Sequence, residues 1–159
     1  TVPTSCVCCA GRRIDFPSRA KKRSSNPRLT ERRTQNEDFY AGLIFHRVIP
    51  GFMIQGGGYD ASYNHHEADS IKGEFASNGF DNQLLHTRGV LSMARTMVPD
   101  SASSQFFIMH EAAPHLDGEY AAFGKITEGL DVVDKIANVA RNFQDMPNVP
   151  VVIKTIRRA

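Results

Sequence analysis

The chain has 159 residues, of which 41% are hydrophobic and 23% charged, a composition ordinary for one soluble globular domain with its own core. No apolar run approaches the roughly 18 residues that a membrane helix needs, so we expect no membrane span. The formal net charge of +2 is too small to indicate a class of partner by itself.

The charge is unevenly distributed. Residues 1–38 contain nine lysines and arginines and four acidic residues, whereas residues 39–159 contain ten and thirteen. The stretch 11–38 shows no strand or helix periodicity and few apolar side chains, so we expect it to be flexible. A nucleic-acid-binding tail is an alternative, but no aromatic residues are spaced for base stacking, and we favour a solvated arm or sequence foreign to the domain. The chain therefore divides into an atypical basic segment, 1–38, and a domain, 39–159.

All three cysteines, Cys6, Cys8 and Cys9, lie in the basic segment. An odd cluster without a distant partner is not a disulfide framework, and it lacks the second ligand pair of a structural zinc site, so we expect no metal. Because the domain uses no cysteine, we expect a reducing, cytoplasmic location. The chain starts at Thr1, which leaves a removed targeting segment open.

From residue 39 onward, short apolar segments alternate with turns, including turns expected at Pro50-Gly51 and at the triple glycine 56–58. The expected strands are residues 43–49, 53–55, 89–94, 105–110, 121–126 and 151–156. One helix is expected after Gly129, because Leu130, Val133, Ala137 and Ala140 recur with helical spacing. Many short strands with few helices predict an all-β barrel or sandwich.

Polar side chains interrupt these apolar strands. Alternation along 43–49 puts Arg47 on the same face as Phe45 and Ile49, with His46 on the other face. Gln55 and Gln105 likewise share a face with apolar neighbours. An arginine among aromatic, thioether and amide side chains suits a neutral, partly apolar ligand with carbonyl groups, such as a peptide. The alternative is an Arg47 ion pair within the core, and the residues alone leave both interpretations open.

Other chemistries have weaker support. The HHE run at 65–67 lacks metal-ligand spacing, and the glycines at 56–58 do not match a dinucleotide-binding fingerprint. The serines at 101–104 have no nucleophile-elbow context. We therefore expect no metal, no cofactor and no covalent nucleophile.

Four segments resemble the successive signature motifs of the cyclophilins, which are peptidyl-prolyl cis/trans isomerases, and in particular their bacterial branch. The segments are FHRVIPGFMIQGG (45–57), SIKGEFASNGFDNQLLHTRGVLSMAR (70–95), DSASSQFFIM (100–109) and HLDGEYAAFGKITEGLDVVDKI (115–136). The resemblance runs from about residue 39 to residue 156. It implies a closed eight-stranded antiparallel β-barrel capped by helices, with the active groove on its outer face.

The resemblance also implies roles for individual residues. Arg47 would be the catalytic arginine, with Phe52 and Gln55 beside it. The implied substrate-binding positions are Met53, Ala94, Arg95, Gln105, Phe107, Leu116, His115 and Tyr120. His115 stands where the best-known eukaryotic members have tryptophan, which implies weak cyclosporin binding. Tyr120 stands where they have histidine, and its hydroxyl group is compatible with a similar polar role.

The N-terminus departs from the family pattern. Family members begin with two strands and a helix, and residues 1–38 show no match to them. We therefore expect these elements to be missing or replaced. The last strand, 151–156, would then have an open edge unless residues 2–7 supply a makeshift strand.

The resemblance implies a peptidyl-prolyl isomerase that assists protein folding and acts on proline-containing peptides and unfolded proteins. We expect a monomer without nucleic acid as a partner. The alternative is a module that binds X-Pro peptides with little or no turnover because its barrel is incomplete.

Overall fold

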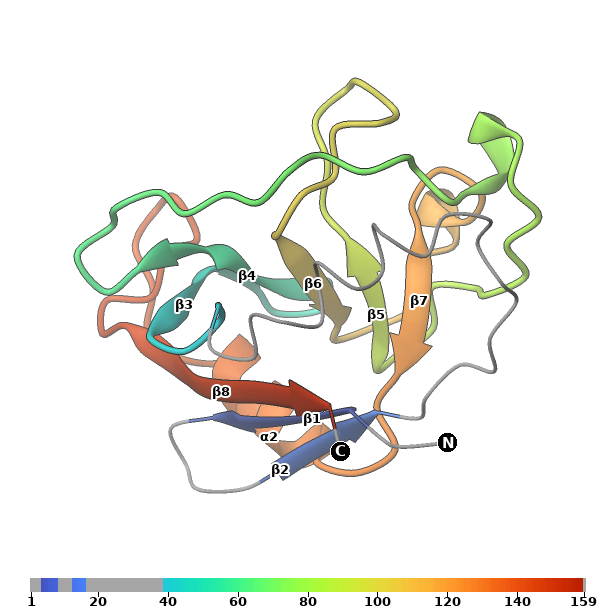
Figure 1. Cartoon of the computed structure of the whole chain (residues 1–159). Helices are drawn as coiled ribbons and strands as arrows, with labels where there is room; N and C mark the ends of the chain where they lie inside the picture. The colour runs from blue at the N-terminus through green and yellow to red at the C-terminus, as the bar shows by residue number, and fades with distance from the viewer. Residues whose placement is uncertain (1–3, 9–12, 17–38, 159) are drawn as a thin grey trace.

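The computed structural model describes the backbone of residues 4–8, 13–16 and 39–158, and the side chains of residues 39–156 (Figure 1). The described chain is mainly β. Its strands are β1 (Thr4–Cys8), β2 (Arg13–Phe16), β3 (Leu43–Ile49), β4 (Met53–Asp60), β5 (Val90–Met93), β6 (Phe106–Met109), β7 (Ala122–Lys125) and β8 (Val151–Arg158). The α-helix is α2 (Leu130–Ala137), and short 3-10 turns span Ala76–Asn78 and Pro114–Leu116.

The strands form one curled sheet in the order β2-β1-β8-β3-β4-β6-β5-β7, and every neighbouring pair is antiparallel. In Figure 1, β8, β1 and β2 lie below the other five strands, with α2 behind them. Within the described backbone, no ladder joins β2 to β7. The predicted antiparallel, mainly β fold is therefore confirmed, while the sheet itself is a curled half-barrel rather than a demonstrated closed barrel.

The last strand does not have the open edge that an incomplete barrel would give it. β1 pairs with β8 from Thr4 opposite Arg158 to Cys8 opposite Ile153, and β2 pairs with β1 on its other side. The backbone groups along this edge of β8 are therefore paired with those of β1. Two strands thus stand where we expected missing or replaced ones, and residues 17–38 lie outside the described residues.

The predicted strands after residue 39 are confirmed to within two residues, with one exception, and the predicted helix is confirmed but ends at Ala137, before Ala140. The strand predicted at 53–55 continues through the triple glycine to Asp60. Neighbouring chain segments approach these glycines closely: a Cβ on Gly56 would lie 2.9 Å from the carbonyl oxygen of Ile44, and one on Gly58 would lie 2.6 Å from the Gln105 side chain. The glycines were expected to make a turn, but they allow close strand packing instead.

Strict alternation along β3 is also wrong. Phe45 and Val48 both pack in the same core cluster, although an even alternation would put them on opposite faces. The reason is a shift in the pairing of β3 with β4 between Phe45 and Arg47, because a bulge adds one residue and reverses the faces beyond it.

The sheet separates two apolar clusters, and β6 contributes to both. Phe106 and Ile108 face the cluster covered by α2, while Phe107 and Met109 face the other. The α2 side chains in the first cluster are Val132, Val133, Ile136 and Ala137. Phe107 is therefore part of the second cluster, which underlies the candidate site.

No helix among the described residues has the length and apolar character to cross a membrane.

Candidate active site

A row of directly paired residues crosses four strands and places the candidate site. Arg47 in β3 lies opposite Gln55 in β4. Gln55 lies opposite Phe107 in β6, which in turn lies opposite Ser92 in β5. Paired residues on antiparallel strands project from the same face. The sheet register therefore brings together an arginine, an amide and an aromatic ring that are far apart in the sequence.

These side chains border a groove of about 210 Å³. Its lining residues are Arg47, Phe52, Met53, Gln55, Ala94, Arg95, Phe107, Leu116 and Tyr120. All nine are among the eleven site residues predicted from the sequence. Met53, Phe107 and Leu116 are at most 8% exposed and form an apolar floor. The groove thus combines a buried apolar base with polar groups at its rim.

Arg47 is the exposed cation of this groove. Among the described residues it has no ion pair, and its position at the surface excludes the core ion pair considered as the alternative. Its guanidinium carries five N–H donors in a rigid plane. Arg47 can therefore offer several donors to a carbonyl-bearing ligand in the groove.

Gln105 lies next to the groove rather than in its lining. Gln55 Nε2 donates a hydrogen bond to Gln105 Oε1 over 2.9 Å, and Gln105 also packs against the backbone of Gly58. This bond fixes the orientation of the Gln55 amide. In the structure Gln105 thus supports Gln55, and its contact with substrate stays a prediction.

Arg95 and Tyr120 form one wall. The guanidinium of Arg95 lies 4.7 Å from the ring centre of Tyr120 and 4.8 Å from that of Phe75. Its Nη2 donates to the carbonyl oxygen of Glu119 over 2.8 Å. The Arg95 side chain is therefore occupied by contacts within the protein.

His115 lies outside the groove lining. Its ring stacks on that of Phe52, with 5.8 Å between the ring centres and 25° between the planes. The residue is exposed. His115 therefore covers the outer side of Phe52.

Sequence reasoning missed a polar network behind Phe107. The buried ring of His86 stacks on Phe107, with 6.1 Å between centres. Its Nδ1 lies 3.0 Å from Asp117 Oδ1, and its Nε2 lies 3.0 Å from Ser92 Oγ. Asp117 also accepts the backbone N–H of His86 over 2.6 Å. The three residues lie in the quoted motifs, but no periodicity relates His86 to Asp117, so only the fold reveals their contact.

The pKa of Asp117 reflects this network. Desolvation, the largest single effect, raises the pKa, but the hydrogen bonds from the backbone and ring of His86, and the nearby charges of His86 and His115, together hold it below its ordinary value. Asp117 is therefore an acceptor for His86 at neutral pH, which keeps the ring beneath Phe107 in place.

The part of the chain with described side chains contains no group of three or more His, Cys, Asp or Glu that could hold a metal ion. The cysteine side chains belong to the segment outside that part. The groove offers hydrogen-bond donors and an apolar floor, which suit a neutral, partly apolar ligand with carbonyl groups.

Comparison with known proteins places these features in a family. A family model described as cyclophilin type peptidyl-prolyl cis-trans isomerase/CLD matches residues 22–158. The match begins inside the basic segment, further toward the N-terminus than the resemblance carried by the four quoted motifs.

Curated relatives carry the same description. A peptidyl-prolyl cis-trans isomerase of Acinetobacter baylyi is 50% identical over 130 residues, which cover 76% of this chain and 66% of the relative. Peptidyl-prolyl cis-trans isomerase B of Escherichia coli is 43% identical over 133 residues, which cover 76% of this chain and 78% of the relative. The chain thus spans just under two thirds of the Acinetobacter protein and more of the Escherichia one.

A solved structure supports the same grouping. A cyclophilin type peptidyl-prolyl cis-trans isomerase of Cryptosporidium parvum, crystallised in the presence of the dipeptide Ala-Pro, matches with a TM-score of 0.76 at 26% identity. The match covers 99% of this chain and 98% of that one. The similarity therefore extends over the whole fold.

Proposed function

The chain belongs to the cyclophilin-type peptidyl-prolyl cis/trans isomerases, and from this premise we propose that Arg47, Phe52 and Gln55 carry out the rotation of X-Pro peptide bonds in the groove. The observation that supports these roles best is the exposed Arg47 beside a buried apolar floor, paired across the sheet with Gln55.

The reaction explains why such a site contains no nucleophile. The peptide bond resists rotation with a barrier of about 18–20 kcal/mol, because its C–N bond has partial double-bond character. Rotation removes this resonance and leaves a lone pair on the proline nitrogen, while no bond to the enzyme forms. A donor from Arg47 aimed at that nitrogen or at the rotating carbonyl oxygen stabilises the twisted bond more than the planar one.

The apolar floor supplies the second half of the mechanism. Met53, Phe107 and Leu116 are the groove's buried apolar surface, which suits a proline ring that must be held while the preceding residue swings. Phe52 lies at the rim of this surface, and burial there lowers the local dielectric around the hydrogen bonds of Arg47. Gln55, fixed by Gln105, orients the substrate backbone.

Proline-containing peptides and unfolded proteins are the proposed substrates. The Cryptosporidium relative was crystallised with Ala-Pro, which supports this substrate class. We further propose a cytoplasmic monomer that binds cyclosporin weakly, because His115 replaces the tryptophan of well-known family members. We also propose that the eight strands close into the family's barrel, an inference supported by the match over nearly the full chain.

The alternative of a binding module without turnover has less support. That hypothesis depended on an incomplete barrel, and the pairing of β1 with β8 removes its main reason. The catalytic arginine position is also retained.

Replacing the arginine tests the proposed function directly. In a protease-coupled assay with an X-Pro peptide, we expect Arg47→Ala to lower kcat/KM roughly 10²–10³-fold, because the donor to the twisted bond is lost. Arg47→Lys keeps the charge but not the planar fork, so we expect an intermediate loss. Because Arg47 is exposed, the melting temperature and peptide binding should change little. Wild-type turnover in Arg47→Ala would refute the role of Arg47.

A further inference from the structure

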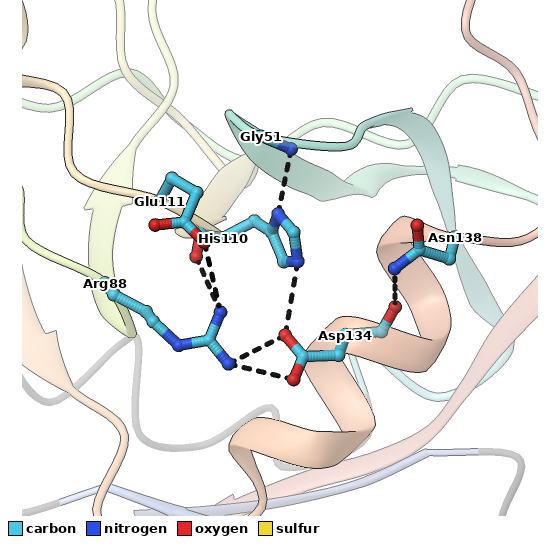
Figure 2. A network of polar contacts seen from close by, with 6 residues as sticks. All are labelled: Gly51, Arg88, His110, Glu111, Asp134 and Asn138. Carbon is cyan, nitrogen blue, oxygen red and sulfur yellow. Dashed lines mark hydrogen bonds and ion pairs between the residues drawn. The ribbon is translucent and has the colours of Figure 1, made fainter.

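His110 lies outside the groove lining, yet it bonds to the turn that carries Phe52. It directly follows β6, and its side chain is 13% exposed. The backbone N–H of Gly51 donates a hydrogen bond to His110 Nδ1 over 2.9 Å (Figure 2). Gly51 immediately precedes Phe52 in the connection between β3 and β4. A side chain remote from the substrate thus holds the residue next to a groove wall.

The partners of the ring determine which nitrogen carries the proton. A backbone N–H can only donate, so Nδ1 of His110 is the unprotonated acceptor. Nε2 lies 3.2 Å from Asp134 Oδ1, and a carboxylate can only accept, so Nε2 carries the proton. The arrangement therefore requires a neutral imidazole with its proton on Nε2. A doubly protonated ring would turn a second donor toward the N–H of Gly51.

Asp134 is itself held in place. Arg88 Nη2 donates to both carboxylate oxygens of Asp134, each over 2.8 Å, and Arg88 Nη1 donates to the carbonyl oxygen of His110 over 3.0 Å. Glu111 adds a longer ion pair to Arg88 at 3.6 Å. Figure 2 shows Arg88 and His110 converging on the Asp134 carboxylate, which projects from α2. These contacts form a chain from α2 through Asp134 and His110 to Gly51.

The same region also holds the other side of the turn. The carbonyl oxygen of Phe52 accepts the backbone N–H of His110 over 2.9 Å and that of Glu111 over 3.3 Å. The Pro50–Gly51 and Phe52–Met53 peptide groups are therefore both bonded to residues 110–111. Only the bond to Gly51 depends on the identity of a side chain.

Gly51 also lies inside a turn that is closed by a backbone hydrogen bond, from the N–H of Phe52 to the carbonyl oxygen of Ile49 over 3.1 Å. The φ of Gly51 is +77°, and among the described atoms none lies within 4 Å of the place where a Cβ would stand. Glycine also samples more backbone conformations than any other residue. The hydrogen bond to His110 thus adds a side-chain contact to the backbone bonds that hold this turn.

We propose that His110 is a positioning residue for the isomerase reaction. Its Nδ1 fixes Gly51, so that Phe52 presents its ring to the proline of the substrate, and Asp134 keeps the proton on Nε2. The inference rests on the proposed function of the groove, and it assigns part of the catalytic geometry to a side chain that does not touch the substrate.

Two near-isosteric substitutions of His110 separate its contact with Gly51 from its contact with Asp134. Asparagine places an oxygen close to the position of Nδ1, so His110→Asn keeps an acceptor for Gly51 and loses the contact with Asp134. Glutamine reaches toward the position of Nε2, so His110→Gln keeps a donor for Asp134 and loses the acceptor. A merely structural role would affect both variants alike.

In the protease-coupled assay we expect His110→Gln to lower kcat/KM roughly tenfold, because small displacements of positioning groups are costly in rate, whereas His110→Asn should stay within about twofold of the wild type. Melting temperatures show that both variants are folded. Equal losses in the two variants, or full activity in His110→Gln, would overturn the proposal.

Nuclear magnetic resonance of the wild-type protein provides a test that does not depend on activity or on the folding of a variant. Ring ¹⁵N shifts at neutral pH should show His110 with an unprotonated Nδ1 and a protonated Nε2. A proton on Nδ1 would overturn the proposal. The Arg47→Ala variant separates a failure of the His110 proposal from a failure of the proposed function. If Arg47→Ala is inactive while His110→Gln is fully active, only the role of His110 is refuted. If Arg47→Ala is fully active, the proposed function of the groove is refuted.

Discussion

At the scale of single residues, two neighbours in β3 have opposite environments. Arg47 is exposed at the groove, whereas the ring of His46 is half-buried and lies edge-on to Tyr59, with 4.8 Å between ring centres. Burial, the largest cause, acts together with the charges of Arg47 and His65 to lower the pKa of His46 from 6.5 to about 4. At neutral pH the folded protein therefore holds His46 uncharged next to the proposed catalytic residue, Arg47.

This pKa shift predicts a loss of stability on acidification. Between pH 6.5 and about 4, the unfolded chain protonates His46 while the folded chain does not. The free energy of unfolding therefore contains a contribution from His46 that is fully present above pH 6.5 and is lost as the pH falls toward 4. We expect the melting temperature of the wild type to fall between pH 7 and pH 5, measured by circular dichroism.

The control for this prediction is His46→Gln, which cannot titrate. Its melting temperature should fall less than that of the wild type over the same range. The depressed carboxyl pKa values of Asp60, Asp100 and Asp117 affect stability only below their ordinary value of 3.8, outside this window. Identical pH profiles for the two proteins would contradict the assignment.

At the scale of elements, the packing of β4 depends on the glycines at 56–58, which the sequence pattern had indicated as a turn. Gly57 adopts a φ of +86° in the middle of the strand, and a Cβ there would lie 2.8 Å from the carbonyl oxygen of Ser104 and 2.9 Å from the Tyr40 ring. Both the backbone conformation and the close packing thus exclude a side chain. β4 carries Met53 and Gln55 into the groove, so its packing also positions the site.

We therefore expect Gly57→Ala to destabilise the protein by about 2–4 kcal/mol, because the left-handed backbone is strained and the Cβ has no room. Urea unfolding measures the change. The matched control is Gly124→Ala in β7, where the structure shows no atom within 4 Å of the new Cβ and no positive φ. That variant should stay within about 0.5 kcal/mol of the wild type. Similar losses in both would argue against the packing explanation.

At the scale of the whole molecule, the pairing of β1 with β8 brings part of the N-terminal segment into the sheet. Composition placed the start of the domain at residue 39, yet the sheet includes Thr4–Cys8 and Arg13–Phe16. β1 lies between β2 and β8, so its backbone groups are bonded on both sides. The N-terminal strands should therefore contribute to the stability of the whole fold.

A proline in β1 tests this contribution. Cys6 lies opposite Ile14 in β2 and Ile156 in β8. Cys6→Pro removes a backbone donor from a strand with neighbours on both sides, and we expect the melting temperature to fall by roughly 5 °C or more. Cys6→Ser keeps the backbone donor and should melt close to the wild type. An unchanged melting temperature in Cys6→Pro would mean that the domain is stable without these strands.

Much of the site could be predicted from local sequence. The motifs around Arg47, Gln105 and Tyr120 are contiguous, and nine of the eleven predicted residues line one groove. After residue 39, the positions of the strands and of α2 followed from short apolar segments and helical spacing, because side-chain spacing along one element is a local property.

The rest depended on tertiary structure. The bonds from His86 to Asp117 and from His110 to Gly51 and Asp134 join segments whose sequence separation carries no periodic signal. The bulge in β3 and the extension of β4 through its glycines likewise follow from how closely neighbouring strands approach. The sequence by itself determined the family and most of the residues that line the groove. Only the fold decided which of them touch the groove and which hold it in place, because those relations exist between chain segments that meet only after folding.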